Sequence, residues 1–359
     1  MTKAPLPPGS TIGIFGGGQL GRMTALAAGE LGYRVHVFDP ETDCPAAQVA
    51  GRHTAAAYDD TTAIEAFADA IDVATFEFEN VPSASLATLK GRVPVRPSGA
   101  VLHVVQDRLR EKDFLNSIGV ATTAYAAVAS PAELAERVQT IGLPAILKGA
   151  RMGYDGKGQR RIDAAAECEA AWKALKAEHA ILEARVDFAC EISVVAARGL
   201  DGDLAAYAPS ENRHRDHILK ESVVPAAVAP DIAAEAQAIT GKIAAALDLV
   251  GLLAVEFFVT KDGALLVNEL APRPHNSGHW TIDACLVSQF EQFVRAVTGL
   301  PLGTAERHSD AVMTNLLGDD VLAWPELAAE GDASLHLYGK KDVRPGRKMG
   351  HVTRIKPKT

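Results

Sequence analysis

The first hundred residues alternate strand-like and helix-like segments, and this rhythm restricts the chain to few folds. Apolar runs at residues 11–16, 34–39 and 73–79 are separated by segments of helical spacing at 19–31 and 61–70. Strands that alternate with helices in this way pair in parallel, with the helices packed on the sheet. We therefore expect an α/β protein that begins with a parallel sheet.

A glycine-rich turn joins the first expected strand to the first expected helix. GGGQLG at residues 16–21 fits GxGxxG, and Asp39 ends the next strand 18 residues after Gly21. The spacing is typical of dinucleotide sites, in which a pyrophosphate approaches the helix N-terminus. Such glycines can also serve close packing or bind another phosphate. An NAD-dependent oxidoreductase therefore stays open as one interpretation.

The length of the chain predicts more than one domain. At 359 residues it exceeds an average domain. Pro and Gly punctuate residues 93–99, and after Leu300 the pattern turns to short strands and a basic hairpin-like tail. We expect a Rossmann-like domain at 1–110, a central domain at 111–300 and a small β-rich domain at 301–359.

Composition narrows the partners and the compartment. A net charge of −9 argues against nucleic acid or an anionic membrane as a partner. The sequence has no apolar run long enough to span a bilayer, and MTKAPLPPGST lacks the apolar core of a secretory signal. Without a CxxC pair, reduced thiols in a cytoplasmic protein are expected for the cysteines, which are Cys44, Cys168, Cys190 and Cys285.

Two glutamates interrupt strand-like runs within residues 252–281. Asp262-Gly263 is a turn signal of the kind that joins antiparallel strands. Counting outward in step from a two-residue loop brings Glu256 directly opposite Glu269. Directly paired side chains point to the same face of a sheet, with Cβ atoms roughly 4.5–5.5 Å apart.

Like charges at this spacing repel each other on an otherwise apolar face. A divalent cation neutralises them best, because Mg²⁺ takes carboxylate oxygens and keeps positions for water or phosphates. Two alternatives stay open: a solvated strand face, on which the pair costs little, and a register slip of one residue, which separates the carboxylates.

A second glycine-rich segment, KGARMGYDGKGQ at 148–159, places Lys148 at the end of a strand and Lys157 in the following loop. Backbone N–H groups of such a loop can surround phosphates. The segment does not fit the Walker pattern GxxxxGK[ST], and a flexible hairpin tip is its alternative interpretation.

Further polar residues gather in strands and loops. Glu183 and Glu191 lie on neighbouring strand segments, where a carboxylate can accept both hydroxyls of a ribose. The loops at 210–216 and 272–280 contain His214, Arg273, His275, Asn276 and His279. A basic stretch that can hold a phosphate monoester contains Lys340, Lys341, Arg344, Arg347 and Lys348. Solvated charges are the alternative for each group.

The order of these motifs resembles the ATP-grasp superfamily. Within it, GGGQLGRM, FEFENVP, GYDGKGQ, SENRHRDHI and APRPHNSGHWT together are similar to the 5-(carboxyamino)imidazole ribonucleotide synthase family. The likeness runs from about residue 12 to residue 348, and APRPHNSGHWT is its most specific piece. The resemblance implies an ATP-grasp fold with a mobile lid at about 120–190, a C-terminal domain that completes a ribonucleotide site, and a homodimer.

The activity that the resemblance implies is an ATP-dependent carboxylation. ATP phosphorylates bicarbonate to carboxyphosphate, and the amine of 5-aminoimidazole ribonucleotide captures the carboxyl group, with ADP and phosphate as the other products. The implied cofactors are ATP and Mg²⁺, or Mn²⁺ in its place. The rivals are formate-dependent formylation of glycinamide ribonucleotide, the NAD-dependent oxidoreductase and a non-catalytic nucleotide-binding module.

The resemblance also implies roles for individual residues. Those implied for ATP are Arg108, Lys148, Gly153, Tyr154, Asp155, Gly156, Lys157, Gly158, Gln159, Glu183, Ala184, Arg185, Val186, Glu191, His214, Asn268 and Glu269. Glu256 and Glu269 are implied as metal ligands. Those implied for the ribonucleotide are Gln19, Leu20, Glu79, Asn276, Lys340 and Arg347. Those implied for the chemistry are Tyr154, Asp155, Arg273, His275 and Lys340.

Two of these residues have more specific implied tasks, and one position departs from the superfamily. Arg273 is implied to clamp bicarbonate or carboxyphosphate through its planar guanidinium, and Asp155 to accept or orient the amine proton. Many superfamily members have asparagine two residues after the second metal glutamate, where this chain has Ala271. Asn268 is expected on the opposite strand face from Glu269.

Overall fold

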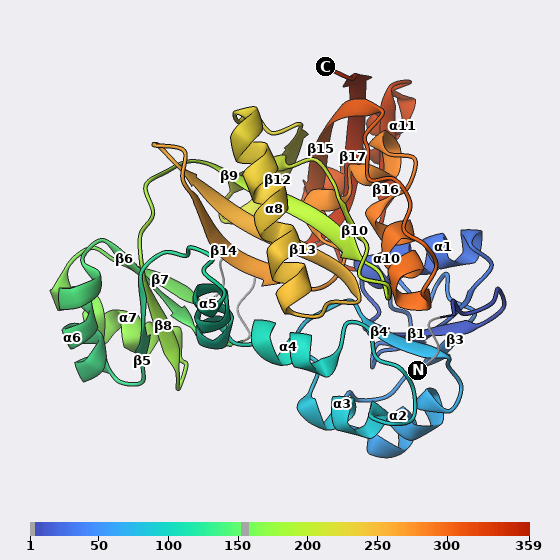
Figure 1. The fold of residues 1–359 in the computed structure, drawn as a ribbon, viewed down its shortest axis with the longest axis horizontal. Helices are drawn as coiled ribbons and strands as arrows, with labels where there is room; N and C mark the ends of the chain where they lie inside the picture. Colours follow the sequence, from blue (N-terminus) through green and yellow to red (C-terminus); the bar gives the residue numbers. More distant parts are fainter. Residues whose placement is uncertain (1–3, 152–157) are drawn as a thin grey trace.

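The N-terminal segment folds as its alternating pattern predicts. In the computed structural model, which describes residues 4–151 and 158–359, a parallel sheet has the strand order β3-β2-β1-β4 (Figure 1). Its strands are β1 Thr11–Phe15, β2 Arg34–Phe38, β3 Arg52–Thr54 and β4 Val73–Phe76. The short β3 was not predicted, because its three residues carry no apolar alternation.

Helices cover both faces of this parallel sheet. Helix α1 (Gln19–Glu30) packs on one face together with α10 (Gln289–Thr298), and both contribute to one apolar cluster. Helices α2 (Thr61–Ala68) and α3 (Ser83–Leu89) pack on the other face. Helices α4 (Gly99–Val105) and α5 (Arg108–Ser117) then lead toward the centre of the molecule.

A long antiparallel sheet forms the centre. Its order within the described chain is β14-β13-β9-β11-β12-β15-β17-β16, and β10 also pairs with β9. The first strands in sequence are β9 Phe188–Arg198, β10 Leu204–Ala206, β11 Ser210–Arg215, β12 Ile218–Val224, β13 Gly251–Thr260 and β14 Leu265–Ala271. Helix α8 (Pro230–Ala246) packs on β9 and β13 from one side, and α10 packs on them from the other.

The C-terminal strands continue this central sheet. They are β15 Ser309–Leu317, β16 Ala333–Leu337 and β17 Lys348–Pro357, with η3 Gly318–Ala323 and α11 Trp324–Ala329 between the first two. The antiparallel pairing of β16 with β17 confirms the hairpin-like tail. The expectation of short strands is wrong for β15 and β17, because alternate polar residues interrupt their apolar pattern.

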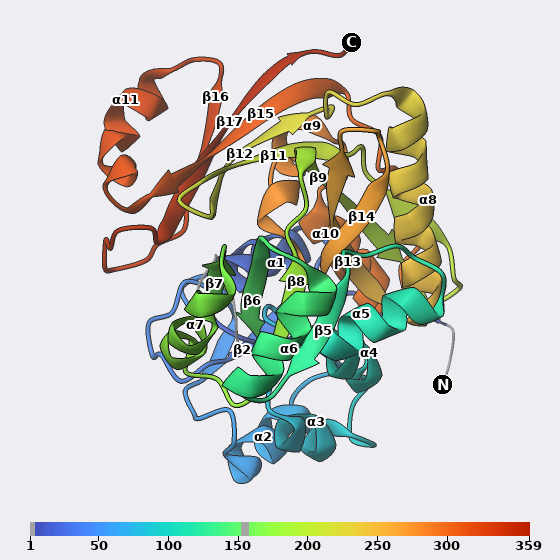
Figure 2. The ribbon, with the colours of Figure 1, turned by 90° about the vertical axis from the view of Figure 1, so that its left-hand side faces the viewer.

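A smaller antiparallel sheet, β5-β8-β6-β7, stands apart from the central one. Its elements are β5 Tyr125–Val128, α6 Pro131–Ile141, β6 Ala145–Gly149, β7 Gln159–Ile162, η1 Ala165–Glu167, α7 Cys168–Leu175 and β8 Ala180–Ala184. Figures 1 and 2 show that α6 and α7 cover the face of this sheet turned away from the central sheet. We call this unit the lid sheet.

The hairpin of β13 and β14 differs from its predicted form in two places. Thr260 pairs with Ala264 through a backbone hydrogen bond of 2.9 Å, so the loop has three residues, 261–263, rather than two. A bulge between Glu256 and Phe257 then shifts the register by one. The two changes compensate, and Glu256 lies opposite Glu269, as predicted.

Candidate active site

The paired glutamates, Glu256 and Glu269, have different charged neighbours. His275 Nε2 lies 3.2 Å from Glu256 Oε1, whereas Arg108 Nη2 lies 3.8 Å from Glu269 Oε2. Burial, followed by the charge of Glu256, raises the pKa of Glu269. Burial acts in the same direction on Glu256, but its hydrogen bond to His275 and the charge of that ring outweigh it and lower the pKa. The Glu256 side chain is 19% exposed and that of Glu269 is 47% exposed, and two opposed carboxylates of this kind could hold a cation between them.

The bulge corrects the predicted orientation of Asn268. Leu266 pairs with Phe258, and Glu269 pairs with Glu256, so Leu266 and Glu269 share one face although three positions separate them. Asn268 lies two residues from Leu266 and therefore on the same side as Glu269. The predicted opposite face is wrong, because a two-residue alternation does not pass through a bulge.

A third carboxylate lies on the same face of the central sheet. Glu191 on β9 pairs with Phe258, two residues along β13 from Glu256. Burial, followed by the charges of Glu256 and Glu269, raises the pKa of Glu191 to about 7. His214 Nδ1 lies 3.3 Å from Glu191 Oε2. This face therefore concentrates negative charge.

The lid sheet contributes the opposing positive charge. Lys148 Nζ lies 2.6 Å from Glu183 Oε2, and Lys112 Nζ from α5 lies 3.3 Å from the other oxygen of the same carboxylate. The side chains of Lys112 and Glu183 are 1% and 4% exposed. Burial acts to raise the pKa of Glu183, but the charges of the two lysines outweigh it and lower the pKa. Both oxygens of the Glu183 carboxylate thus contact lysines, and the contact with Lys148 fixes the position of that side chain.

The connection from β8 to β9 is partly committed to internal hydrogen bonds. The backbone N–H of Ala184 donates to Ala124, that of Arg185 donates to Pro144, and the Ala184 carbonyl accepts from Thr123 Oγ1. Of the residues predicted for ATP here, Ala184 and Arg185 thus use these backbone groups for contacts within the protein.

Polar residues that follow β14 extend the site toward the N-terminal domain. Arg273 Nε lies 2.6 Å from Glu79 Oε1, so the predicted anion clamp contacts a predicted substrate residue. His275 Nδ1 lies 2.8 Å from Ser277 Oγ. Asn276, in η2 (Asn276–Gly278), is 6% exposed, and both polar atoms of its side chain are buried without a protein partner in the described chain. An unpaired buried amide is costly and indicates a ligand at this position.

The predicted ribonucleotide residues Lys340 and Arg347 lie in a loop that contacts the N-terminal domain. Gln19 and Leu20 begin α1, and the side chain of Gln48 donates to the carbonyl of Gly339, which precedes Lys340. Lys340 Nζ donates to the Lys348 carbonyl at 2.7 Å. Arg347 Nη1 donates to the Asp342 carbonyl at 3.0 Å. The basic loop between β16 and β17 thus lies against the N-terminal domain.

The glycine turn is filled by carboxylates of the chain itself. Glu77 accepts hydrogen bonds from the backbone N–H groups of Gly18 and Gly21, the latter at 2.7 Å, and Asp39 accepts from Gly17 at 2.7 Å. A Cβ added at Gly17 would lie 2.1 Å from Cys44 Sγ. Because Glu77 occupies the position where a pyrophosphate would sit, the dinucleotide interpretation of GxGxxG is wrong and the glycines serve close packing.

Several predicted residues lie outside the described part of the chain. These are Gly153, Tyr154, Asp155, Gly156 and Lys157. Gly158 and Gln159 follow directly, and Gln159 pairs with Lys148. Among the described residues, no helix combines the length and the apolar character that crossing a bilayer requires.

Comparison with family models covers nearly the whole chain. Residues 10–106 match a ribonucleotide synthetase preATP-grasp domain, residues 113–290 an ATP-grasp domain, and residues 311–359 a phosphoribosylaminoimidazole carboxylase C-terminal domain. The N5-carboxyaminoimidazole ribonucleotide synthase of Brucella melitensis is 52% identical over 361 residues, which is 100% of each chain. The chain belongs to the N5-carboxyaminoimidazole ribonucleotide synthase family.

Further members of this family agree in sequence and in structure. The Bacillus subtilis enzyme is 46% identical, with 99% of this chain and 94% of that chain covered. An N5-carboxyaminoimidazole ribonucleotide synthetase solved with ADP superposes with a TM-score of 0.95 at 42% identity, over 98% of this chain and 94% of the other. The Aspergillus clavatus enzyme, solved with ADP and 5-aminoimidazole ribonucleotide, gives 0.92 at 31% identity, over 98% and 95%. The predicted ATP-grasp fold and the assignment as a ligase of purine biosynthesis are confirmed.

Proposed function

We propose that this chain carboxylates 5-aminoimidazole ribonucleotide with bicarbonate at the expense of ATP. The observation that carries the proposal is the pairing of Glu256 with Glu269 on a face that also holds Glu191, opposite Lys148 of the lid sheet. Phosphoryl transfer requires mainly positioning and neutralisation of charge, and these residues can provide both.

The opposed carboxylates fit a magnesium ion. Both side chains are acceptor-only oxygen ligands, and their mutual repulsion is relieved by a divalent cation. When bound, Mg²⁺ or Mn²⁺ would neutralise charge on the phosphates of ATP. Arg108 and Lys148 would contact those phosphates, and Asn268 joins Glu269 beside them. Glu191 would hold the ribose hydroxyls, with His214 at its other side.

The residues after β14 are proposed to hold the one-carbon substrate. Arg273 presents a planar fork that matches bicarbonate or the carboxyl group of carboxyphosphate. His275 lies between Glu256 and Ser277, so it joins this position to the cation site. The unpaired side-chain amide of Asn276 supplies a donor and an acceptor nearby.

The ribonucleotide is proposed to lie between the N-terminal domain and the β16–β17 loop. Gln19, Leu20 and Glu79 would contact its ribose and base, and Lys340 and Arg347 its phosphate. Charge-assisted hydrogen bonds to a phosphate are stronger than those between neutral groups, so Lys340 and Arg347 would provide much of the affinity for this substrate. The contact of Arg273 with Glu79 supports a position of the amine close to the carboxyl donor.

The carboxylation step itself would proceed by direct capture. The amine nitrogen attacks the carboxyl carbon of carboxyphosphate, the bond from that carbon to the phosphate oxygen breaks, and phosphate leaves with the electron pair. We propose that Asp155 receives the amine proton and that Tyr154 contacts the imidazole. Because carboxyphosphate is labile in water, closure of the lid at about 120–190 would protect it. Asp155→Asn should lower turnover far more than ATP affinity.

The remaining assignments concern the whole protein. We propose that it works as a cytoplasmic homodimer. We also propose a division at 1–110, 111–300 and 301–359, in which the last segment completes the ribonucleotide site through Lys340 and Arg347. Sedimentation of the full-length chain at several concentrations would test the dimer.

The proposal is tested by following ADP release from Mg²⁺-ATP. We expect release when 5-aminoimidazole ribonucleotide and bicarbonate are added together, with labelled carboxyl carbon on the amine. Either substrate alone should give little release. Glycinamide ribonucleotide with formate is the matched control. Turnover with that pair, and none with the first, would overturn the substrate assignment and leave the ATP site intact.

A further inference from the structure

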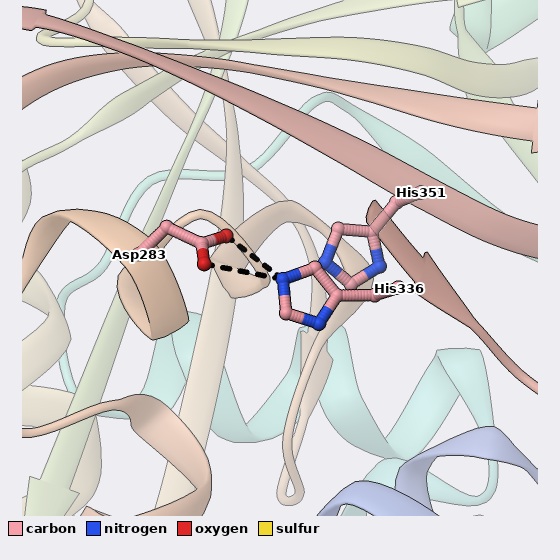
Figure 3. Close-up of side chains that lie close together, drawn as sticks. All are labelled: Asp283, His336 and His351. Atoms are coloured by element: carbon pink, nitrogen blue, oxygen red, sulfur yellow. Dashed lines mark hydrogen bonds and ion pairs between the residues drawn. The ribbon is translucent and has the colours of Figure 1, made fainter. Parts of the chain in front are cut away.

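Three metal-ligand side chains meet behind the ribonucleotide loop. Asp283 comes from α9 (Thr281–Ala284), His336 from β16 and His351 from β17. One potential ligand atom from each lies within 4.8 Å of the other two. His336 Nε2 lies 3.0 Å from Asp283 Oδ2. Figure 3 shows the two imidazole rings stacked, each with a nitrogen edge toward the Asp283 carboxylate.

Two buried ring nitrogens at this cluster have no protein partner. Tyr338 Oη lies 2.8 Å from His351 Nδ1, which leaves Nε2 as the remaining nitrogen of that ring. His351 Nε2 is buried without a hydrogen-bond partner in the described chain, and so is His279 Nε2. The rings of His279 and His351 are 4.9 Å apart, and both side chains are 0% exposed. Buried polar atoms are normally paired, so two adjacent exceptions point to a ligand.

We propose that Asp283, His336 and His351 bind a divalent transition-metal ion of the zinc class. Two imidazoles and a carboxylate match zinc rather than Mg²⁺, which prefers oxygen ligands. Bonds of about 2.0–2.2 Å require the ligand atoms to come closer than 4.8 Å, and the stacked rings would have to turn so that a nitrogen of each points at the ion. His279 or a water molecule would complete a tetrahedral site.

The ion would connect two parts of the protein. Helix α9 follows the active-site segment of Arg273 and His275, whereas β16 and β17 flank the loop that carries Lys340 and Arg347. A metal shared by α9 and these strands would fix that loop against the central sheet. Its role would be structural, because its ligand set differs in chemistry from the Glu256–Glu269 pair.

The test measures zinc bound to the full-length chain after loading and gel filtration. Because Glu256, Glu269 and His275 can also bind zinc, the background carries Glu256→Gln and Glu269→Gln. We expect about one zinc ion per chain in this background. His351→Gln and, separately, Asp283→Asn should each lower the zinc content at least tenfold. His103→Gln, which changes an exposed histidine on α4, should retain it.

Thermal unfolding of the same proteins separates loss of the site from loss of the fold. Zinc should raise the melting temperature of the background and of His103→Gln, and should leave that of Asp283→Asn unchanged. Asp283→Asn is nearly isosteric and is expected to fold when His351→Gln does not. Absence of zinc from the background, or an undiminished zinc content in Asp283→Asn, would overturn the proposal.

Discussion

The glycine turn after β1 and the β13–β14 hairpin each bring two carboxylates together, and they differ in what lies opposite those carboxylates. At the turn, Glu77 and Asp39 accept backbone N–H groups of the glycines at hydrogen-bonding distance. At the hairpin, Glu256 faces Glu269 and neither accepts such a backbone hydrogen bond among the described contacts. A carboxylate that accepts backbone hydrogen bonds stabilises the fold, whereas two that face each other repel, and a bound cation would relieve that repulsion.

This contrast explains why the more familiar motif is the less informative one. GxGxxG requires only that backbone approach something closely, and here the close neighbours are Glu77, Asp39 and Cys44. Two glutamates that lie directly opposite each other on neighbouring strands repel, which is costly unless a ligand compensates it. The opposed glutamates therefore indicate a functional site more reliably than the GxGxxG motif does.

The largest expected effect is on the hairpin. Glu269→Gln removes one carboxylate of the pair, and we expect turnover to fall by about 10²–10³-fold, as when a group that stabilises transition-state charge is lost. Stability should not fall, because the repulsion from Glu256 that raises the pKa of Glu269 is also removed. ADP release and chemical denaturation of the same preparations measure the two effects.

Glu235→Gln, on the exposed face of α8, is the matched control and should leave both quantities unchanged. A Glu269→Gln protein that kept its turnover would show that the pair is not the cation site. One that lost turnover and stability together would remove the contrast with the glycine turn.

The next effect concerns pH and the fold of the N-terminal domain. His36 on β2 is 1% exposed, with Nε2 2.8 Å from Thr54 Oγ1. Burial, followed by the charges of Arg52 and His53, lowers its pKa to about 4. The unfolded chain then binds a proton below pH 6.5 that the folded chain does not, so stability is full above pH 6.5 and falls toward pH 4.

We expect this titration to cost about 3 kcal/mol of unfolding free energy between pH 6.5 and 4. Urea denaturation across this range measures it, with His36→Gln as the comparison. Turnover of His36→Gln at pH 7 should equal that of the parent protein. An equal pH dependence in the two proteins would rule out His36 as its source.

A third effect tests the packing role of the glycines. In Gly17→Ala, the added Cβ meets Cys44 Sγ and Asp39, and overpacking of this kind destabilises by about 1–3 kcal/mol. Gly29→Ala on α1, the helix that follows this turn, is the control, since nothing lies within 4 Å of its Cβ, and it should stabilise by about 0.5–1 kcal/mol. ATP affinity should be unchanged in both variants. Weaker ATP binding in Gly17→Ala alone would make the turn a nucleotide site after all.

The sequence predicted the elements whose signals are local. The parallel N-terminal sheet follows from alternating strand and helix periods, and the Glu256–Glu269 pairing follows from the turn signal. That pairing was correct for a partly wrong reason, because a three-residue loop and a bulge shift the register in opposite senses. Neither irregularity has a residue pattern that a two-residue count can detect.

The residues that sequence reasoning missed act over long separations. Lys112 lies in a strongly polar helix yet is buried against Glu183, and Glu77 reaches glycines more than 50 positions earlier. From the polarity of its helix alone, Lys112 would be predicted to be exposed to solvent. The residues next to Glu77 in the sequence do not indicate which distant group it contacts. Their roles depend on how domains pack, which local periodicity does not describe.

The smallest expected effect comes from Glu111, a further carboxylate beside the hairpin, which accepts a backbone hydrogen bond as the carboxylates of the glycine turn do. Glu111 on α5 is 3% exposed, and its Oε2 accepts the backbone N–H of Leu270 at 3.2 Å. Burial, followed by the charge of Glu269, raises its pKa to about 8, so it is protonated at neutral pH. Glutamine has nearly the same shape and is also neutral.

Glu111→Gln should therefore keep turnover at pH 7 and change the unfolding free energy by less than about 0.5 kcal/mol. Glu111→Ala should cost about 1–3 kcal/mol, because the N–H of Leu270 loses its acceptor in a buried position. Turnover and urea denaturation of both variants distinguish the roles. A large loss of turnover in Glu111→Gln would mean that the negative charge of this side chain is needed beside Glu269. The hydrogen bond to the backbone would then not distinguish carboxylates that stabilise the fold from carboxylates that act in catalysis.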